Sequence, residues 1–203
     1  MKVAIIKYNA GNVQSVLYAL QRLGIGAFVT DDQEEIKAAD KVIFPGVGHA
    51  ASAMDYLKEK NLDQLIISLK QPVLGICLGL QLLCKFSEEG NTKCLGIFNS
   101  DVKKFDDSVF QNKNLVPVKI PHMGWNTITD LSSPLMTDIS EDSFVYFVHS
   151  YYAELSDETI ATTDYIHPFS SGMHKANFYG VQFHTEKSAE AGAKILSNFL
   201  KIK

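Results

Sequence analysis

The chain has 203 residues and a net charge of −4, with 46% apolar and 21% charged residues. This length suits one domain with a sizeable core, and this composition is typical of a globular protein. The sequence has no basic stripe of the kind that nucleic-acid-binding proteins carry, so we expect no nucleic-acid partner. The apolar run Val3 to Ile6 is too short for a signal peptide or a membrane span, which predicts a cytoplasmic protein without membrane contact.

The first part of the chain alternates predicted strands with predicted helices. Short apolar runs predict strands at residues 3–6, 25–29, 42–44 and 73–76. Apolar residues at helical spacing predict helices at residues 13–23, ending at Gly24, at 54–69 and at 78–84. Strands and helices in alternation indicate a parallel sheet with helices on both faces.

After about residue 95 the pattern changes to short alternating segments. They predict antiparallel strands and hairpins, added to the sheet, at residues 101–105, 115–120, 144–148, 159–164 and 176–182. Loops are expected at 106–114 and 130–142, and a last helix at 188–203. The sequence therefore predicts a single α/β domain over residues 1–203, with a mainly parallel central sheet, flanking helices and antiparallel strands added in the C-terminal half.

The sharpest local signal is the segment Gly75-Ile76-Cys77-Leu78-Gly79, which follows an apolar strand and opens a helix. It matches the Gly-x-nucleophile-x-Gly turn, in which a sharp strand-to-helix bend exposes the central side chain above the sheet. Crowding at the bend requires small neighbours, and the start of the helix favours the thiolate form of the cysteine. The backbone N–H of Leu78 is placed to donate to an oxyanion. The alternative is a buried cysteine at a strand end, flanked by turn glycines.

The other two cysteines, Cys84 and Cys94, are interpreted as structural. An odd number of cysteines does not form a disulfide framework, and no Cys or His spacing resembles a zinc or iron–sulfur site. The segment around Cys77 also lacks the lysine and spacing of a phosphate-binding loop. We therefore expect neither a metal nor a cofactor.

A nucleophilic thiol needs a base, and the base needs a group that orients it. Among the six histidines, His184 is the best placed because it ends an apolar strand at residues 179–183. Glu186 lies two residues further, and in an extended segment residues i and i+2 point the same way. This spacing predicts a His184–Glu186 pair, although a lone histidine at a strand end is more often a surface residue.

The segment Pro45-Gly46-Val47-Gly48 follows the third predicted strand. Its glycines allow backbone N–H groups to turn towards a ligand, which would supply a second oxyanion donor. By itself the segment is equally compatible with an ordinary strand-to-helix loop.

Three motifs together resemble those of the class I, triad-type glutamine amidotransferases, which have a flavodoxin-like fold. In chain order they are residues 45–48, Gly75 to Gln81, and His184-Thr185-Glu186. Within that class the chain is similar to the glutaminase subunits of imidazole glycerol phosphate synthase. The cues for that similarity are residues 8–12, 121–126, 149–151 and 186–188, which together cover most of the chain.

The resemblance implies a role for each matching residue. Cys77 would attack the side-chain amide of glutamine, His184 would pass a proton to the leaving ammonia, and Glu186 would orient His184. The remaining matches are Val47, Gly48 and Leu78 for the oxyanion, Gln81, Ser150 and Tyr151 for glutamine, and Trp125, Tyr146 and Lys187 for the synthase partner. The resemblance also implies that a peptide bond in the oxyanion segment flips to complete the oxyanion hole.

The resemblance further implies a second chain, because no part of this one has the size of a synthase. That partner would be a (β/α)8-barrel cyclase subunit, which would form a heterodimer with this chain and use its ammonia in histidine biosynthesis. Three positions depart from the family pattern: Lys7, Asn9 and Thr185 stand where Asp, Gly and Pro are usual. Three alternatives stay open: the glutaminase of another biosynthetic synthase, a catalytically silent binding module of the same fold, and a cysteine peptidase built on the same turn.

Overall fold

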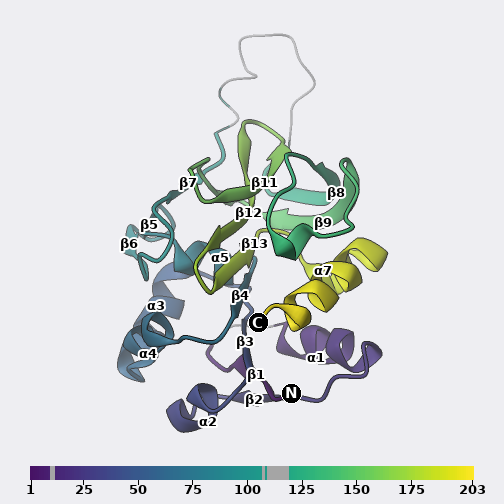
Figure 1. The fold of residues 1–203 in the computed structure, drawn as a ribbon. Helices are drawn as coiled ribbons and strands as arrows, with labels where there is room; N and C mark the ends of the chain where they lie inside the picture. Colours follow the sequence, from purple (N-terminus) through teal and green to yellow (C-terminus); the bar gives the residue numbers. More distant parts are fainter. Residues whose placement is uncertain (10–11, 107, 109–118) are drawn as a thin grey trace.

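The computed structural model describes residues 1–9, 12–106, 108 and 119–203 of a layered α/β fold (Figure 1). Its centre is a sheet of parallel strands, continued on one side by mostly antiparallel ones. In spatial order the parallel strands are β2 (Ala27–Thr30), β1 (Val3–Ile6), β3 (Lys41–Phe44), β4 (Val73–Ile76) and β13 (Phe178–Val181). The strands that follow are β12 (Pro168–Lys175), β10 (Tyr151–Ala153), β7 (Asp101–Lys104), β5 (Phe86–Ser87) and β6 (Thr92–Lys93), while β11 (Thr159–Asp164) pairs with β12.

Helices cover both faces of this sheet, as Figure 1 shows. One face carries α3 (Ala50–Glu59), α4 (Leu62–Ser68) and α5 (Leu78–Leu83), and the other carries α1 (Val13–Arg22) and α7 (Ala189–Lys201). A short helix α2 (Gln33–Lys37) connects β2 and β3. None of the described helices is long and apolar enough to cross a membrane.

A separate ribbon of two antiparallel strands packs beside α7. It consists of β8 (His122–Ile128) and β9 (Ser143–His149), joined by a segment that contains the 3-10 helix η1 (Pro134–Met136). The sequence-based expectation that residues 144–148 extend the main sheet is therefore wrong. Because side chains alternate along a strand, one face of this ribbon is buried and the other is left open.

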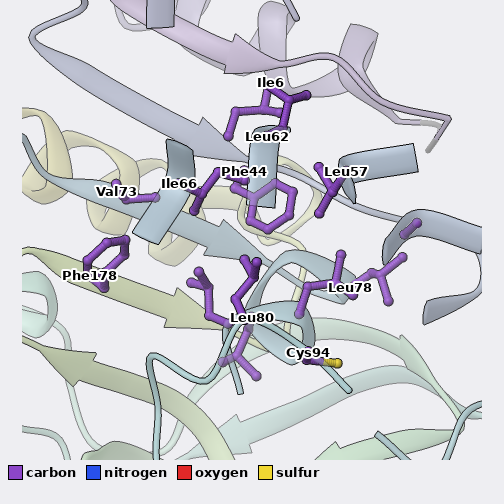
Figure 2. Packing of buried hydrophobic residues seen from close by; sticks show 14 of the residues in the cluster. Ile6, Phe44, Leu57, Leu62, Ile66, Val73, Leu78, Leu80, Cys94 and Phe178 are labelled. Atoms are coloured by element: carbon purple, nitrogen blue, oxygen red, sulfur yellow. The ribbon is translucent and has the colours of Figure 1, made fainter. Parts of the chain in front are cut away.

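Close packing of large apolar side chains holds the helices against the sheet. Figure 2 shows the cluster beneath α3, α4 and α5, where Phe44 of β3 lies among Leu57, Leu62 and Ile66. Each of these side chains is fully buried, which stabilises the fold by about 1.5–3 kcal/mol per residue. Leu78 and Leu80 belong to the same cluster, so the helix that follows Cys77 is fixed by the core.

Most of the predicted strands and helices are confirmed, and two predictions besides that for residues 144–148 need correction. The single helix expected at residues 54–69 is two helices, because Asn61 adopts a left-handed conformation, with φ at +53°, between α3 and α4. The strand expected at 176–182 is β13, which pairs in parallel with β4 as well as antiparallel with β12. The strand expected at 115–120 falls largely outside the described residues, as do most of the loop at 106–114 and the cue residues Ala10 and Gly11.

Candidate active site

Cys77 stands at a sharp turn between β4 and α5. Its φ of +53° and ψ of −109° are unusual for a residue other than glycine, and such strain is found at functional sites. The turn is held by the Cys77 N–H, which donates to the carbonyl of Val181 in β13 at 2.8 Å. The predicted nucleophile turn is thus present in the structure, with Cys77 at its apex.

The two glycines of the turn allow α5 to approach the sheet very closely. A Cβ atom on Gly79 would lie 1.9 Å from the carbonyl oxygen of Phe44 in β3. A Cβ atom on Gly75 would lie 2.8 Å from the carbonyl carbon of Gly79 and from the nitrogen of Leu80. Both clashes are with backbone atoms, so only glycine fits at these two positions.

His184 and Glu186 form a buried pair directly after β13. The Nδ1 atom of His184 lies 2.7 Å from Oε1 of Glu186, and both side chains are almost completely buried. Extended backbone does not produce this contact, contrary to the sequence-based argument. Residues Thr185–Lys187 form the 3-10 helix η2, which turns the carboxylate back towards the imidazole.

Asn12 completes the surroundings of this pair. Its side-chain Nδ2 donates to Oε1 of Glu186 and lies 3.3 Å from Nδ1 of His184. Because the acidic oxygen accepts from both neighbours, its position relative to the imidazole is fixed. Sequence reasoning included Asn12 only as a cue of family resemblance and assigned it no part in the site.

The electrostatic surroundings of His184 favour the imidazolium. Burial by itself lowers the pKa of His184, but the neighbouring Cys77 sulfur and the Glu186 carboxylate outweigh burial and raise that pKa from 6.5 to about 10. The Nε2 atom of His184 is buried and makes no hydrogen bond with any residue that the structure describes. The histidine therefore has one nitrogen fixed by Glu186 and the other available for chemistry beside Cys77.

A cavity of about 330 Å³ opens at Cys77. Its lining includes all the residues predicted for the oxyanion and for glutamine, namely Val47, Gly48, Leu78, Gln81, Ser150 and Tyr151. Glu89, Pro121, Val148 and His149 complete it. The structure thus brings these predicted residues together around the thiol, whereas His184 and Glu186 are not among the residues that line this cavity.

The oxyanion segment is in a conformation that occupies the Leu78 N–H group. That N–H donates to the carbonyl of Gly46 at 3.3 Å, while Gly48 has a φ of +125°, which favours glycine. In this arrangement the Leu78 donor points to the protein's own backbone. A substrate oxygen would have to displace the Gly46 carbonyl to receive the hydrogen bond.

Gln81 uses its side-chain nitrogen within the protein. Its Nε2 donates to the carbonyl of Tyr151 at 2.8 Å and to Oε1 of Gln182 at 3.0 Å. The Tyr151 carbonyl also accepts from Nδ1 of His149 at 2.8 Å. Gln81 therefore ties the predicted glutamine-binding segment to α5.

Two buried histidines extend this network away from the cavity. Since Nδ1 of His149 donates to a carbonyl, its Nε2 accepts from Nδ1 of His122 at 3.0 Å, and Nε2 of His122 lies 3.3 Å from Nδ2 of Asn126. Burial lowers the pKa of His122 to about 4 and that of His149 to about 3. Both rings are thus neutral and hydrogen-bonded through Nδ1–H.

The residues predicted to face a partner lie on the open face of the ribbon and beside it. Trp125 is 52% exposed and its ring lies edge-on to that of Tyr146, with 5.9 Å between centroids. The Nζ atom of Lys187 lies 5.8 Å from the centre of the Tyr146 ring. Met123 and Phe144, at 63% and 61% exposed, extend the same face. The three predicted residues therefore form one cluster within an exposed apolar surface.

Sequence reasoning missed Glu89, Gln182 and the His122–His149 pair. Glu89 lies in a turn and enters the cavity by tertiary packing, for which the local sequence gives no signal. Gln182 precedes the predicted base by two residues and comes beside Cys77 through the pairing of β13 with β4, which its own segment does not signal.

Of the three departures from the family pattern, Lys7 and Asn9 lie away from the Cys77 cavity, and Thr185 lies in η2 between His184 and Glu186. Lys7 lies 3.9 Å from Asp31, and Asn9 donates to the carbonyl of Ser52, so neither touches the Cys77 cavity. Thr185 is buried with its hydroxyl unpaired among the described residues. In those residues no group of three or more His, Cys, Asp or Glu side chains is arranged to hold a metal ion.

The nucleophile turn, the His–Glu pair and the surrounding sheet define the class of protein. A family model described as glutamine amidotransferase class-I matches residues 4–202, and the chain belongs to this family. A solved structure of a glutamine amidotransferase from Thermotoga maritima has a TM-score of 0.65 at 17% identity, covering 98% of this chain and 82% of that one. At that identity the likeness concerns the fold.

Similarity to particular relatives narrows the class. The chain is 60% identical to a Bacteroides fragilis protein and 55% identical to one from Bacteroides thetaiotaomicron, each over the full length of both chains. A protein from Vibrio parahaemolyticus is 43% identical, with 99% of this chain and 98% of that one covered. All three carry the name imidazole glycerol phosphate synthase subunit HisH. Within the family the chain is therefore a HisH-type member.

Proposed function

We propose that the chain hydrolyses glutamine to glutamate and ammonia with Cys77, His184 and Glu186, and that the ammonia serves a cyclase subunit in histidine biosynthesis. The observation that carries this proposal is the strained Cys77 turn, which opens on a cavity and lies beside an imidazole held by a buried carboxylate. We assign the glutaminase to one domain over residues 1–203. We place it in the cytoplasm, where a reducing environment preserves the three free thiols.

The arrangement supports acyl transfer in two halves. The Cys77 thiolate attacks the side-chain amide carbon of glutamine, and the carbonyl oxygen becomes an oxyanion that the Leu78 N–H stabilises once the Gly46 carbonyl has moved away. The His184 imidazolium gives its Nε2 proton to the departing nitrogen, the C–N bond breaks, and neutral ammonia leaves a glutamyl thioester. His184 then takes a proton from water, which attacks the thioester and releases glutamate and the thiolate.

The cavity also offers groups that match the polar ends of glutamine. Ser150 and Tyr151 line the cavity, and Gln81 holds their segment in place. The Glu89 carboxylate is the acidic group in the lining, and it suits the α-ammonium of an amino acid. We therefore assign glutamine recognition to Gln81, Ser150 and Tyr151, with Glu89 for the ammonium group.

The partner in this proposal is the cyclase subunit of imidazole glycerol phosphate synthase, a (β/α)8 barrel that binds this chain as a heterodimer. The relatives' name describes one part of a larger enzyme, and ammonia must pass directly to its user because it escapes from an open site. Trp125, Tyr146 and Lys187 lie on an exposed face that suits an interface, since aromatic residues are enriched in interface cores. The products would be imidazole glycerol phosphate and an aminoimidazole carboxamide ribonucleotide.

The engaged Leu78 N–H suggests that the resting chain is a poor glutaminase. Partner binding would favour the backbone state that frees this donor, since a ligand shifts an equilibrium towards the state it binds better. Glutamine hydrolysis should be measured for the chain alone, with the cyclase, and with the cyclase plus its nucleotide substrate. We expect the rate to rise in that order, and three equal rates would reject this control.

The test of the whole proposal is Cys77→Ala assayed together with the cyclase. Glutamine-dependent synthesis should disappear while synthesis from added ammonium salts persists, because the cyclase needs only ammonia. Loss of both would make Cys77 a structural residue. Retention of glutamine-dependent synthesis would exclude Cys77 as the nucleophile.

A further inference from the structure

Gln182 is a buried polar residue that the triad mechanism leaves unused. It follows β13 directly, and its side chain is fully buried. The pairing of Val181 with Ile76 places Gln182 opposite Cys77 at the end of the neighbouring strand. Its Nε2 atom lies 3.6 Å from the sulfur of Cys77.

The orientation of the Gln182 amide is determined by a chain of hydrogen bonds. A backbone carbonyl can only accept, so the carbonyl of Tyr151 requires the nitrogen of the Gln81 side chain to face it. The same Gln81 nitrogen donates to Gln182, so the oxygen of Gln182 must face Gln81. The nitrogen of Gln182 then faces the Cys77 sulfur. Exchanging the positions of the Gln182 amide nitrogen and oxygen would break the hydrogen bonds of Gln182 with Gln81 and with the sulfur.

We propose that Gln182 is a further catalytic residue, whose side-chain N–H donates to the Cys77 sulfur and stabilises the thiolate. This inference rests on the proposed function, because it assigns a role in the chemistry of Cys77. A hydrogen bond from a neutral donor is much stronger to a thiolate than to a thiol, so the contact favours the charged form. Its donor is held by Gln81 before glutamine arrives, and no reorganisation is needed during the reaction.

Gln182 and the proposed base His184 have different tasks. His184 exchanges a proton with the leaving group and with water, whereas Gln182 keeps its protons throughout. When the thioester is hydrolysed, the C–S bond breaks and its electron pair returns to sulfur, where the Gln182 N–H stabilises it. Gln182 therefore assists at the beginning of acylation and at the end of deacylation.

The test uses two variants of similar length, Gln182→Met and Gln182→Glu, together with Ser171→Ala as the control. Ser171 is fully buried, and its carbonyl accepts from the Gln182 backbone N–H, but its hydroxyl makes no hydrogen bond with the sulfur or with any other described residue. The rate of Cys77 alkylation by iodoacetamide is measured against pH, with the modified peptide mapped by mass spectrometry. Thermal unfolding establishes that each variant is folded.

We expect the midpoint of the alkylation profile to move up by about 1–2 pH units in Gln182→Met, the loss expected for a hydrogen bond to a charged group. Gln182→Glu should move it at least as far, because a carboxylate repels the thiolate. Ser171→Ala should leave the midpoint in place. An unchanged midpoint in both folded Gln182 variants would overturn the proposal and leave Gln182 a packing residue.

A second measurement covers the case in which the variants do not fold. In the otherwise unchanged protein, the Gln182 side-chain N–H signal is followed by NMR before and after Cys77 is converted to alanine. A large change supports the contact, and an unchanged signal overturns it. The two proposals fail separately: glutaminase activity retained by Cys77→Ala rejects the triad, whereas a normal alkylation profile in Gln182→Met rejects only the role of Gln182.

Discussion

Gly79→Ala is the substitution for which the structure gives the clearest magnitude. The new Cβ would lie 1.9 Å from the carbonyl oxygen of Phe44 and 2.9 Å from its carbonyl carbon. No side-chain rotation relieves a clash between a Cβ and backbone, so α5 must move away from β3 by roughly 1 Å. Because this movement separates packed surfaces, its cost lies at the upper end of overpacking, about 3 kcal/mol.

Two further effects act on this variant. Replacing glycine by alanine reduces the conformational freedom of the unfolded chain, which stabilises the protein by about 0.4–1 kcal/mol. The free energy of unfolding should therefore fall by about 2 kcal/mol or more in total. For a chain of this size the melting temperature should fall by about 4–8 °C. Movement of α5 also displaces the Leu78 N–H relative to Cys77, and a misplacement of about 1 Å costs on the order of 100-fold in rate.

The assay compares thermal unfolding and glutamine hydrolysis of Gly79→Ala with those of Gly26→Ala. Gly26 is exposed, and a Cβ there meets nothing within 4 Å, so this control carries the same chemical change without the clash. The reasoning is refuted if both variants melt within about 2 °C of each other and hydrolyse glutamine equally fast.

Four other predictions concern the site, the two buried histidines and the proposed partner interface. In Glu186→Gln, loss of the carboxylate lowers the pKa of His184 from about 10, so the alkaline limb of the kcat/KM profile should move to lower pH. An alkaline limb at the same pH would contradict the interaction of His184 with Glu186. Nitrogen-15 NMR of His122 and His149 should show Nδ1–H tautomers that do not titrate between about pH 5 and 8, and titration near pH 6.5 would contradict their burial. The folded pKa values of His122 and His149 are lowered, so the stability that the two neutral rings contribute is present above pH 6.5 and is lost as the pH falls towards about 4. The free energy of unfolding should fall by about 1.4 kcal/mol per pH unit for each ring. Denaturant unfolding at several pH values measures this slope, and a flat curve would contradict it. Trp125→Ala should weaken cyclase binding at least 10-fold in a titration, because exposed aromatic residues are frequent hot spots, while Ile67→Ala, at another exposed apolar residue, should not; equal affinities would move the interface elsewhere.

Local sequence was sufficient to predict the sharp turn between β4 and α5 with Cys77 at its apex. A strand followed by Gly75-Ile76-Cys77-Leu78-Gly79 has few physical solutions, because the glycines are needed wherever a helix starts this close to a sheet. The helices at residues 13–22 and 189–201 could also be predicted from the sequence, since each carries an apolar face at helical spacing. Each of these features leaves a pattern of glycines or apolar residues within its own segment of the sequence.

The predictions fail where the structure depends on the backbone conformation of a single residue or on contacts between residues far apart in the sequence. Asn61 divides a regular apolar pattern by adopting one left-handed backbone conformation, which the periodicity of leucines does not reveal. The 3-10 turn after His184 produces the right pair for a reason different from the one expected. Glu89 and Gln182 reach the cavity and the sulfur only through tertiary packing, so no motif in their own segments identifies them.

The most direct test of the shared role of Cys77, His184 and Glu186 is covalent labelling with an electrophilic glutamine analogue, mapped by mass spectrometry. One adduct should form on Cys77, none should form on Cys84 or Cys94, and an excess of glutamine should prevent it. Labelling should also slow strongly in the folded His184→Ala variant. If Cys77 stays unmodified in the folded protein with its partner bound, or reacts equally fast without His184, the three side chains do not act together as a glutaminase.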